Sequence, residues 1–136
     1  MEYQSSTKLL YKDVSYLIQG GFFEVYKQFR NRFKEKIYLR ALAEYLKNKN
    51  LDIATEKQIP IYFQGKKIGT YVPDIVVNDC IFVELKCKPR ITQDDVKQFW
   101  YYLKGTDYKV SYLVNFGSAR GVQIVRRVYD SARNKK

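Results

Sequence analysis

Residues 72–86 read VPDIVVNDCIFVELK, and this stretch decides the fold. Two short apolar runs, 75–77 and 81–83, flank the turn-forming pair Asn78-Asp79, which predicts a β-hairpin. Because neither run alternates with polar residues, we expect central strands that are covered on both faces of a sheet. Helices are therefore needed on each side of that sheet.

Two acidic residues and a lysine stand at the ends of these runs. Glu84 and Lys86 are two positions apart, so they project from the same face of the strand while Leu85 points to the other. A surface ion pair is the ordinary explanation of such a motif. Unpaired charge at the end of a buried strand is costly, however, so Asp74, Glu84 and Lys86 are candidates for a catalytic site.

The register of the hairpin decides whether Asp74 joins this site. A two-residue turn would pair Asp74 with Val83 and place its side chain on the wrong face. A three-residue loop, 78–80, pairs it with Glu84, and Asn or Asp tolerates the left-handed backbone that such a loop needs. We predict the longer loop, or an equivalent bulge near Pro73.

Neighbouring carboxylates favour a bound cation, because without one they repel each other and one takes up a proton. Mg²⁺ would use Asp74 and Glu84 as ligands, with the Leu85 carbonyl as a third and water completing the octahedron. Such an ion polarises a phosphoryl oxygen and lowers the pKa of bound water. Lys86 could orient that water and stabilise the transition state.

Composition narrows the function. The 136 residues are 46% apolar, which predicts one globular domain spanning residues 1–136. A net charge of +11 favours a polyanionic partner, and the absence of histidine excludes imidazole catalysis. Cys80 and Cys87 are predicted to be buried free thiols. With no apolar run of about 20 residues and no leader segment, we expect a cytoplasmic protein without a membrane partner.

Periodicity predicts an α/β fold in which helices flank a mixed β-sheet, in the order ααβββαββ. The basic tail at 131–136 is expected to fray. The predicted helices cover 11–30, 34–49 and 92–104, and the predicted strands cover 59–63, 68–77, 80–86, 109–115 and 122–129.

The arrangement of Pro73, Asp74, Glu84 and Lys86 resembles the PD-(D/E)xK nuclease superfamily, and residues 33–38 resemble its GxxExxY branch. That resemblance implies a restriction-endonuclease-like core and dependence on Mg²⁺, with Mn²⁺ as a substitute. Within the branch motif, Glu35 and Tyr38 occupy the named positions, while Arg32 replaces the glycine. The resemblance makes Glu35 an additional acidic ligand of the metal or a contact to it through water.

Gln98 and Tyr102 resemble the Q-x-x-x-Y helix motif of exonuclease-like members of the superfamily. A spacing of four places both side chains on one face of a helix. By this resemblance Gln98 hydrogen-bonds the attacking water or a phosphate and is catalytic. We argue for a buried position of Gln98, and Tyr102 lies beside it as a nucleic-acid contact or a core residue.

These features predict a nuclease that cleaves phosphodiester bonds in DNA, favoured over RNA, with low sequence specificity. Two alternatives stay open: a catalytically silent nucleic-acid-binding subunit and a dimeric junction resolvase. Whether the protein is a monomer or a homodimer is likewise open. Phosphate contacts position a strand without reading its sequence, and we expect them from Arg30, Arg32, Lys34, Lys36, Lys88 and Arg90.

Overall fold

The computed structural model describes residues 11–130, which form three helices, a five-stranded sheet and a separate two-stranded hairpin. The predicted α/β class, with helices flanking a mixed β-sheet, is confirmed. The helices are α1 (Lys12–Phe29), α2 (Glu35–Lys47) and α3 (Gln93–Gly105). The strands are β1 (Ile53–Ala54), β2 (Ile59–Phe63), β3 (Lys66–Tyr71), β4 (Ile75–Val77), β5 (Ile81–Lys86), β6 (Val110–Asn115) and β7 (Gln123–Val128).

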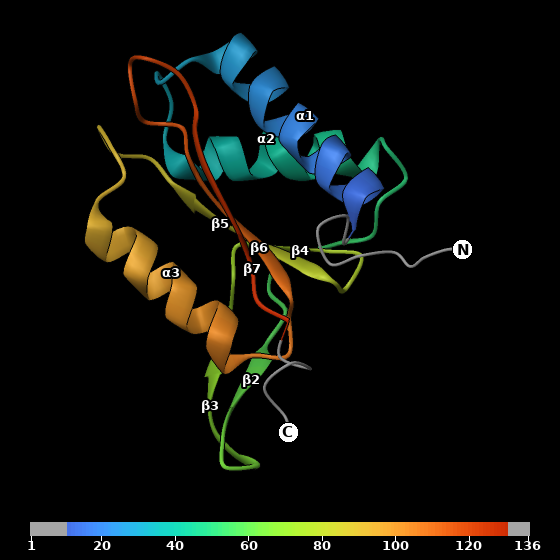
Figure 1. Ribbon diagram of the computed structural model, residues 1–136. Coiled ribbons are helices and arrows are strands. Elements are labelled where there is room, and N and C mark those ends of the chain that lie inside the picture. The colour runs from blue at the N-terminus through green and yellow to red at the C-terminus, as the bar shows by residue number, and fades with distance from the viewer. Residues whose placement is uncertain (1–10, 131–136) are drawn as a thin grey trace.

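The main sheet has the strand order β1-β4-β5-β6-β7, and only β5 and β6 run parallel. Parallel neighbours need a long crossover, and α3 supplies it. Helices α1 and α2 cover one face of the sheet and α3 covers the other (Figure 1). The sheet is therefore buried on both faces, as the apolar runs predicted.

Alternation along β5 assigns its side chains to these two layers. Val83 and Leu85 pack in the core beneath α1 and α2. Phe82 packs in the core beneath α3. Since residues two apart share a face, Glu84 and Lys86 follow Phe82 onto the α3 side.

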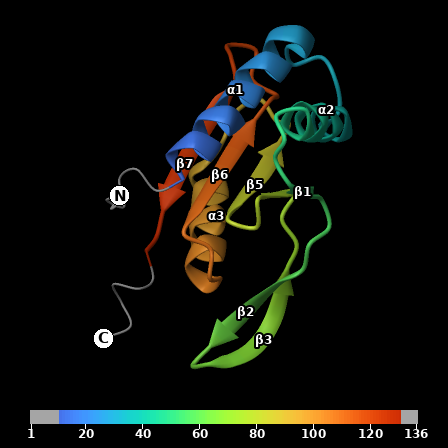
Figure 2. The same ribbon diagram turned by 90° about the vertical axis from the view of Figure 1, so that its right-hand side faces the viewer.

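The predicted strand at 68–77 is wrong in one respect, because it is divided into β3 and β4. Pro73 lies between them and has no N–H to give to a ladder. Strand β3 pairs with β2 alone, and this hairpin projects from the body of the protein (Figure 2). The two-residue β1 was also missed, because it is too short to show a period. The element order is therefore ααβββββαββ rather than ααβββαββ.

The hairpin register that sets the site is confirmed. Strands β4 and β5 pair with Val77 opposite Ile81, which leaves the three-residue loop that was predicted. The first two loop residues, an Asn-Asp pair, have φ angles of 51° and 53°, the left-handed region those residues tolerate. The same register, continued by one pair, brings Asp74 beside Glu84.

Three further expectations can be compared with the structure. Cys80 and Cys87 are free, as predicted, but half-buried rather than buried. The basic tail at 131–136 lies outside the described residues. Among residues 11–130, no helix is both long enough and apolar enough to cross a membrane.

Candidate active site

Asp74 and Glu84 interlock through the backbone of their two segments. The Asp74 N–H donates to Glu84 Oε1 at 3.0 Å. In return, the Leu85 N–H donates to Asp74 Oδ2 at 2.7 Å. Both carboxylates are half-buried, and each accepts a backbone N–H from the segment that carries the other. The hairpin therefore presents two carboxylates as one rigid pair.

The electrostatics of this pair favour a cation. Burial raises the pKa of Glu84, and the Asp74 carboxylate raises it further, to about 7. The Tyr71 hydroxyl and the Asp74 N–H offset part of this rise by lowering the pKa of Glu84. Without a cation, the raised pKa favours the protonated form of Glu84. A cation beside the pair would displace that proton.

The backbone of Leu85 is also turned toward this pair. The Phe116 N–H donates to the Lys86 carbonyl at 3.0 Å, so the Lys86 carbonyl points toward the β6 side of β5. Successive residues of a strand turn their backbone groups to opposite sides. The Leu85 carbonyl consequently points away from β6, toward the side on which its own N–H binds Asp74.

Lys86 shares an acidic neighbour with Lys88. Lys86 Nζ lies 4.0 Å from Asp95 Oδ1, whereas Lys88 Nζ donates to Asp95 Oδ2 at 2.8 Å. Asp95 also forms a capping box with Thr92 at the start of α3. Burial raises the pKa of Asp95, but the bonds from Lys88 and Thr92 outweigh it and lower that pKa to about 2. Lys88 therefore forms a close ion pair with Asp95, whereas Lys86 lies at the outer limit of an ion pair with the same carboxylate.

Glu35, itself an exposed residue, lies at the first position of α2, where it is within electrostatic range of Asp74 and Lys86. Burial raises the pKa of Glu35, the Asp74 carboxylate raises it too, and the Lys86 ammonium lowers it. Its flanking residues Lys34 and Lys36 are exposed. Glu35 thus approaches the site from the helical layer opposite α3.

Tyr38 holds the turn that places Glu35. Its buried hydroxyl donates to the Arg30 carbonyl and accepts the Phe33 N–H at 3.2 Å. Its ring stacks on Phe116, with centroids 4.8 Å apart and planes 5° from parallel. The family resemblance identified Tyr38 only as a position in the motif. In the structure, Tyr38 closes the α1–α2 turn.

The glycine that Arg32 replaces is not required by this backbone. The positive φ in the α1–α2 turn belongs to Arg30, at 52°. Arg32 is not among the residues of the described range that have positive φ. The substitution therefore introduces no left-handed strain at position 32.

On α3, the expected burial of Gln98 is wrong. Phe99 and Leu103 form the buried face of the helix, and Gln98 lies exposed beside it. Tyr102 stacks on Tyr71, with ring centroids 3.9 Å apart. The helix therefore brings Tyr102, through Tyr71, against the Glu84 side of the site.

Tyr71 is the site residue that the sequence did not reveal. Its hydroxyl is buried close to the Glu84 carboxylate but forms no hydrogen bond of ordinary geometry within residues 11–130. Burial raises the pKa of Tyr71, and the nearby Glu84 carboxylate raises it further. Its one available signal was its place three residues before Asp74.

The donor set fits a hard divalent cation. Within residues 11–130, no group of three or more His, Cys, Asp or Glu side chains is arranged to hold a metal ion. Mg²⁺, however, commonly uses one or two carboxylates and keeps several waters. Asp74, Glu84 and the Leu85 carbonyl supply that kind of partial oxygen shell.

The chain belongs to the PD-(D/E)XK nuclease superfamily, whose sequence profile matches residues 12–128. Nucleases of this superfamily generally use divalent metal ions, and membership supports a hydrolase that acts on nucleic acid. No curated protein matches the chain.

One solved structure shows a low overall likeness. It is an alkaline exonuclease from Laribacter hongkongensis, with 17% sequence identity and a TM-score of 0.49. The likeness covers 73% of this chain and 57% of that one, so this chain spans little more than half of the exonuclease.

Proposed function

We propose that this protein is a metal-dependent nuclease of the GxxExxY branch that hydrolyses phosphodiester bonds in DNA with low sequence specificity. The observation that carries the proposal is the interlocked pair of Asp74 and Glu84, with Lys86 on the same strand face as Glu84. The half-buried pair, with the pKa of Glu84 raised to about 7, supports a site for Mg²⁺, with Mn²⁺ as a substitute.

Each residue of the site then has a distinct role. Asp74 and Glu84 would bind the ion directly, the Leu85 carbonyl would complete the protein ligands, and Glu35 would contact the ion through water. When bound, the ion polarises the scissile phosphate and lowers the pKa of a bound water. Lys86 donates hydrogen bonds to the attacking water and to the developing negative charge on the phosphate.

Residues around the site would bind the nucleic-acid strand. Gln98 is exposed on α3 and can donate to a phosphate, while Tyr102 contacts the nucleic acid at the edge of its stack with Tyr71. Phosphate contacts without base contacts give affinity with little sequence preference. The basic side chains proposed for these contacts are Arg30, Arg32, Lys34, Lys36, Lys88 and Arg90.

Cleavage assays test this proposal. The protein is incubated with single-stranded, duplex, flapped and four-way-junction DNA and with matching RNA, in Mg²⁺, Mn²⁺ or chelator. We expect metal-dependent cleavage of DNA that falls by at least about a hundredfold in Asp74→Asn and in Lys86→Ala. Two variants away from the site, Asp107→Asn and Lys47→Ala, serve as controls and keep full activity.

Other outcomes would point elsewhere. Cleavage that survives Asp74→Asn would overturn the assigned site. Nucleic-acid binding without cleavage under every condition would support the silent binding subunit instead. Selective cleavage of four-way junctions by a protein of dimeric native mass would support the junction resolvase.

A further inference from the structure

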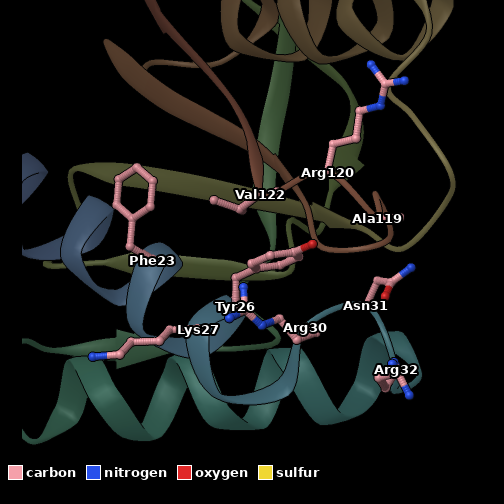
Figure 3. Close-up of a pocket in the computed structure, with 10 residues that line it drawn as sticks. Phe23, Tyr26, Lys27, Arg30, Asn31, Arg32, Ala119, Arg120 and Val122 are labelled. Carbon is pink, nitrogen blue, oxygen red and sulfur yellow. The ribbon is translucent and has the colours of Figure 1, made fainter.

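A cavity of about 830 Å³ lies where the end of α1 and the α1–α2 turn face the loop between β6 and β7 (Figure 3). Its lining comes from two segments, 23–32 and 119–122. Figure 1 shows this loop, drawn in orange-red, passing beside the end of α1. We call this cavity the basic pocket. Its size falls in the range of pockets that take small organic ligands.

The charge of the basic pocket is unbalanced. Four cationic residues line it, namely Lys27, Arg30, Arg32 and Arg120, and no acidic residue does. None of the four forms an ion pair with another residue in the range 11–130. Lys88, by contrast, is paired with Asp95. An open cavity with several unneutralised cations attracts an anion, and arginine matches the oxygens of a phosphate group.

The walls of the basic pocket are fixed by hydrogen bonds and close packing. The Tyr26 hydroxyl donates to the Ser118 carbonyl at 2.6 Å, which ties α1 to the β6–β7 loop. At Gly117, an added Cβ would lie 2.2 Å from the Lys88 backbone nitrogen, so this loop packs tightly on the segment that follows β5. The pocket is thus preformed and coupled to the strand that carries Lys86.

An aromatic ring accompanies the charges. Phe23 lines the basic pocket and leaves 57% of its surface exposed, and Figure 3 shows its ring extending from α1. Exposed aromatic rings beside basic groups are platforms on which the bases of single strands stack. The pocket therefore offers sites for both parts of a nucleotide.

The basic pocket and the carboxylate pair are connected by the α1–α2 turn. Cys87 Sγ donates to the Phe33 carbonyl at 3.3 Å, so this turn touches the residue that follows Lys86. Glu35, just beyond the turn, interacts with Asp74. The α1–α2 turn therefore borders both the basic pocket and the end of the strand that carries Lys86.

We infer that the basic pocket binds a phosphate group of the cleaved strand, away from the scissile bond, with the adjoining base against Phe23. The inference rests on the proposed function and adds to it a second anchoring site for the strand. Terminal and internal phosphates share this chemistry. If the pocket binds a terminal phosphate, the protein acts at the ends of nucleic-acid strands. If it binds an internal phosphate, the protein can bind anywhere along a nucleic-acid strand.

Binding measurements test the pocket apart from catalysis. In an Asp74→Asn background, fluorescence anisotropy with a labelled single-stranded oligonucleotide compares Lys27→Gln/Arg120→Gln with Arg40→Gln/Lys47→Gln. Each double variant loses one lysine and one arginine from exposed positions, so their net charges are equal. We expect about tenfold weaker binding and a shallower salt dependence for the pocket variant alone. Phe23→Leu should weaken binding to single strands in the same assay.

The ends of the probe distinguish the two sources of phosphate. Oligonucleotides with a 5′-phosphate, a 3′-phosphate or neither, and a circular single strand, are bound in parallel. A preference for one phosphorylated end that disappears in the pocket variant assigns a terminal phosphate. Equal weakening on linear and circular strands assigns an internal one.

Equal affinities of the two double variants for every probe would overturn the inference. That result is separate from failure of the proposed function, which appears as absence of metal-dependent cleavage by the wild-type protein. A protein that cleaves normally but shows no pocket effect refutes the pocket alone. A pocket effect without any cleavage refutes the nuclease and retains the phosphate site.

Discussion

The rings of Tyr71 and Tyr102 lie 3.9 Å apart and 11° from parallel, which joins the projecting β2–β3 hairpin to helix α3. Tyr71 is 6% exposed, and its hydroxyl lies beside the carboxylate of Glu84. The stack therefore positions a buried hydroxyl against one of the two proposed metal ligands. Because that hydroxyl has no hydrogen bond of ordinary geometry within residues 11–130, its removal should not unfold the protein.

Tyr71→Phe should shift the pH dependence of cleavage to higher pH. The hydroxyl lowers the pKa of Glu84, so its loss raises that pKa, and a higher pH is needed to ionise the ligand. Rate profiles between pH 5 and 9 check this, with Tyr102→Phe as a control that keeps a stacked ring. An unchanged acid limb in Tyr71→Phe would show that the hydroxyl has no such influence.

In chelator, the folded state should lose stability as pH rises from about 4.5 to 7. Glu84 has a folded pKa of about 7, above its ordinary value of 4.5, so in that window the native protein holds a proton that the unfolded chain releases. The full shift corresponds to about 3 kcal/mol as an upper estimate. Urea unfolding at pH 5 and pH 8 measures it. Glu84→Gln should flatten the difference, and Asp107→Asn should not.

Divalent metal should stabilise the wild-type protein at pH 8. An ion that binds only the folded state contributes about 2.7 kcal/mol at a hundredfold excess over its Kd. Thermal unfolding with and without Mg²⁺ should therefore show a rise in Tm that Asp74→Asn loses. A rise of equal size in Asp74→Asn would place the ion elsewhere.

Asp95→Asn should destabilise the protein by about 1 kcal/mol. The substitution removes the ion pair with Lys88 and weakens the capping box at Thr92. The matched variant is Asp94→Asn, which changes the neighbouring exposed acid in the same helical turn. Urea unfolding of the two variants should differ, and equal midpoints would contradict the role assigned to Asp95.

Tyr38→Phe should destabilise the protein by about 1–3 kcal/mol, because it leaves the part-buried Phe33 N–H and Arg30 carbonyl without their hydrogen-bond partner. The change also loosens the turn before Glu35, so cleavage should weaken at metal concentrations below saturation and recover at higher ones. Tyr101→Phe, at an exposed position, is the control for both measurements. Full stability of Tyr38→Phe would refute this role.

Short-range chemistry made parts of the fold predictable. The Asn-Asp loop set the register of β4 on β5, and Thr92 with its acidic first turn identified the start of α3. The division at Pro73 was missed because β3 and β4 are consecutive in sequence, and their separation depends on which partner strand each finds. Strand pairing of that kind is a property of the whole chain.

The candidate site, like the fold, could be predicted only in part from local sequence. Glu84 and Lys86 share a face because of strand periodicity alone. The exposure of Gln98 depends on how α3 is rotated against the sheet, and the approach of Tyr71 to Glu84 depends on where the β2–β3 hairpin packs. Neither of these arrangements is determined by local sequence.

The separate pairing of β2 with β3 gives the protein a part that can change length without disturbing the rest. Its turn lies at Gln64 and Gly65, beyond the last residue pair of the hairpin. At the other end of β3, the chain enters the main sheet only after Pro73. Residues added at that turn would lengthen the arm while the spacing between Asp74 and Glu84 stays the same. Reach over a substrate and the geometry of the carboxylates can therefore vary independently.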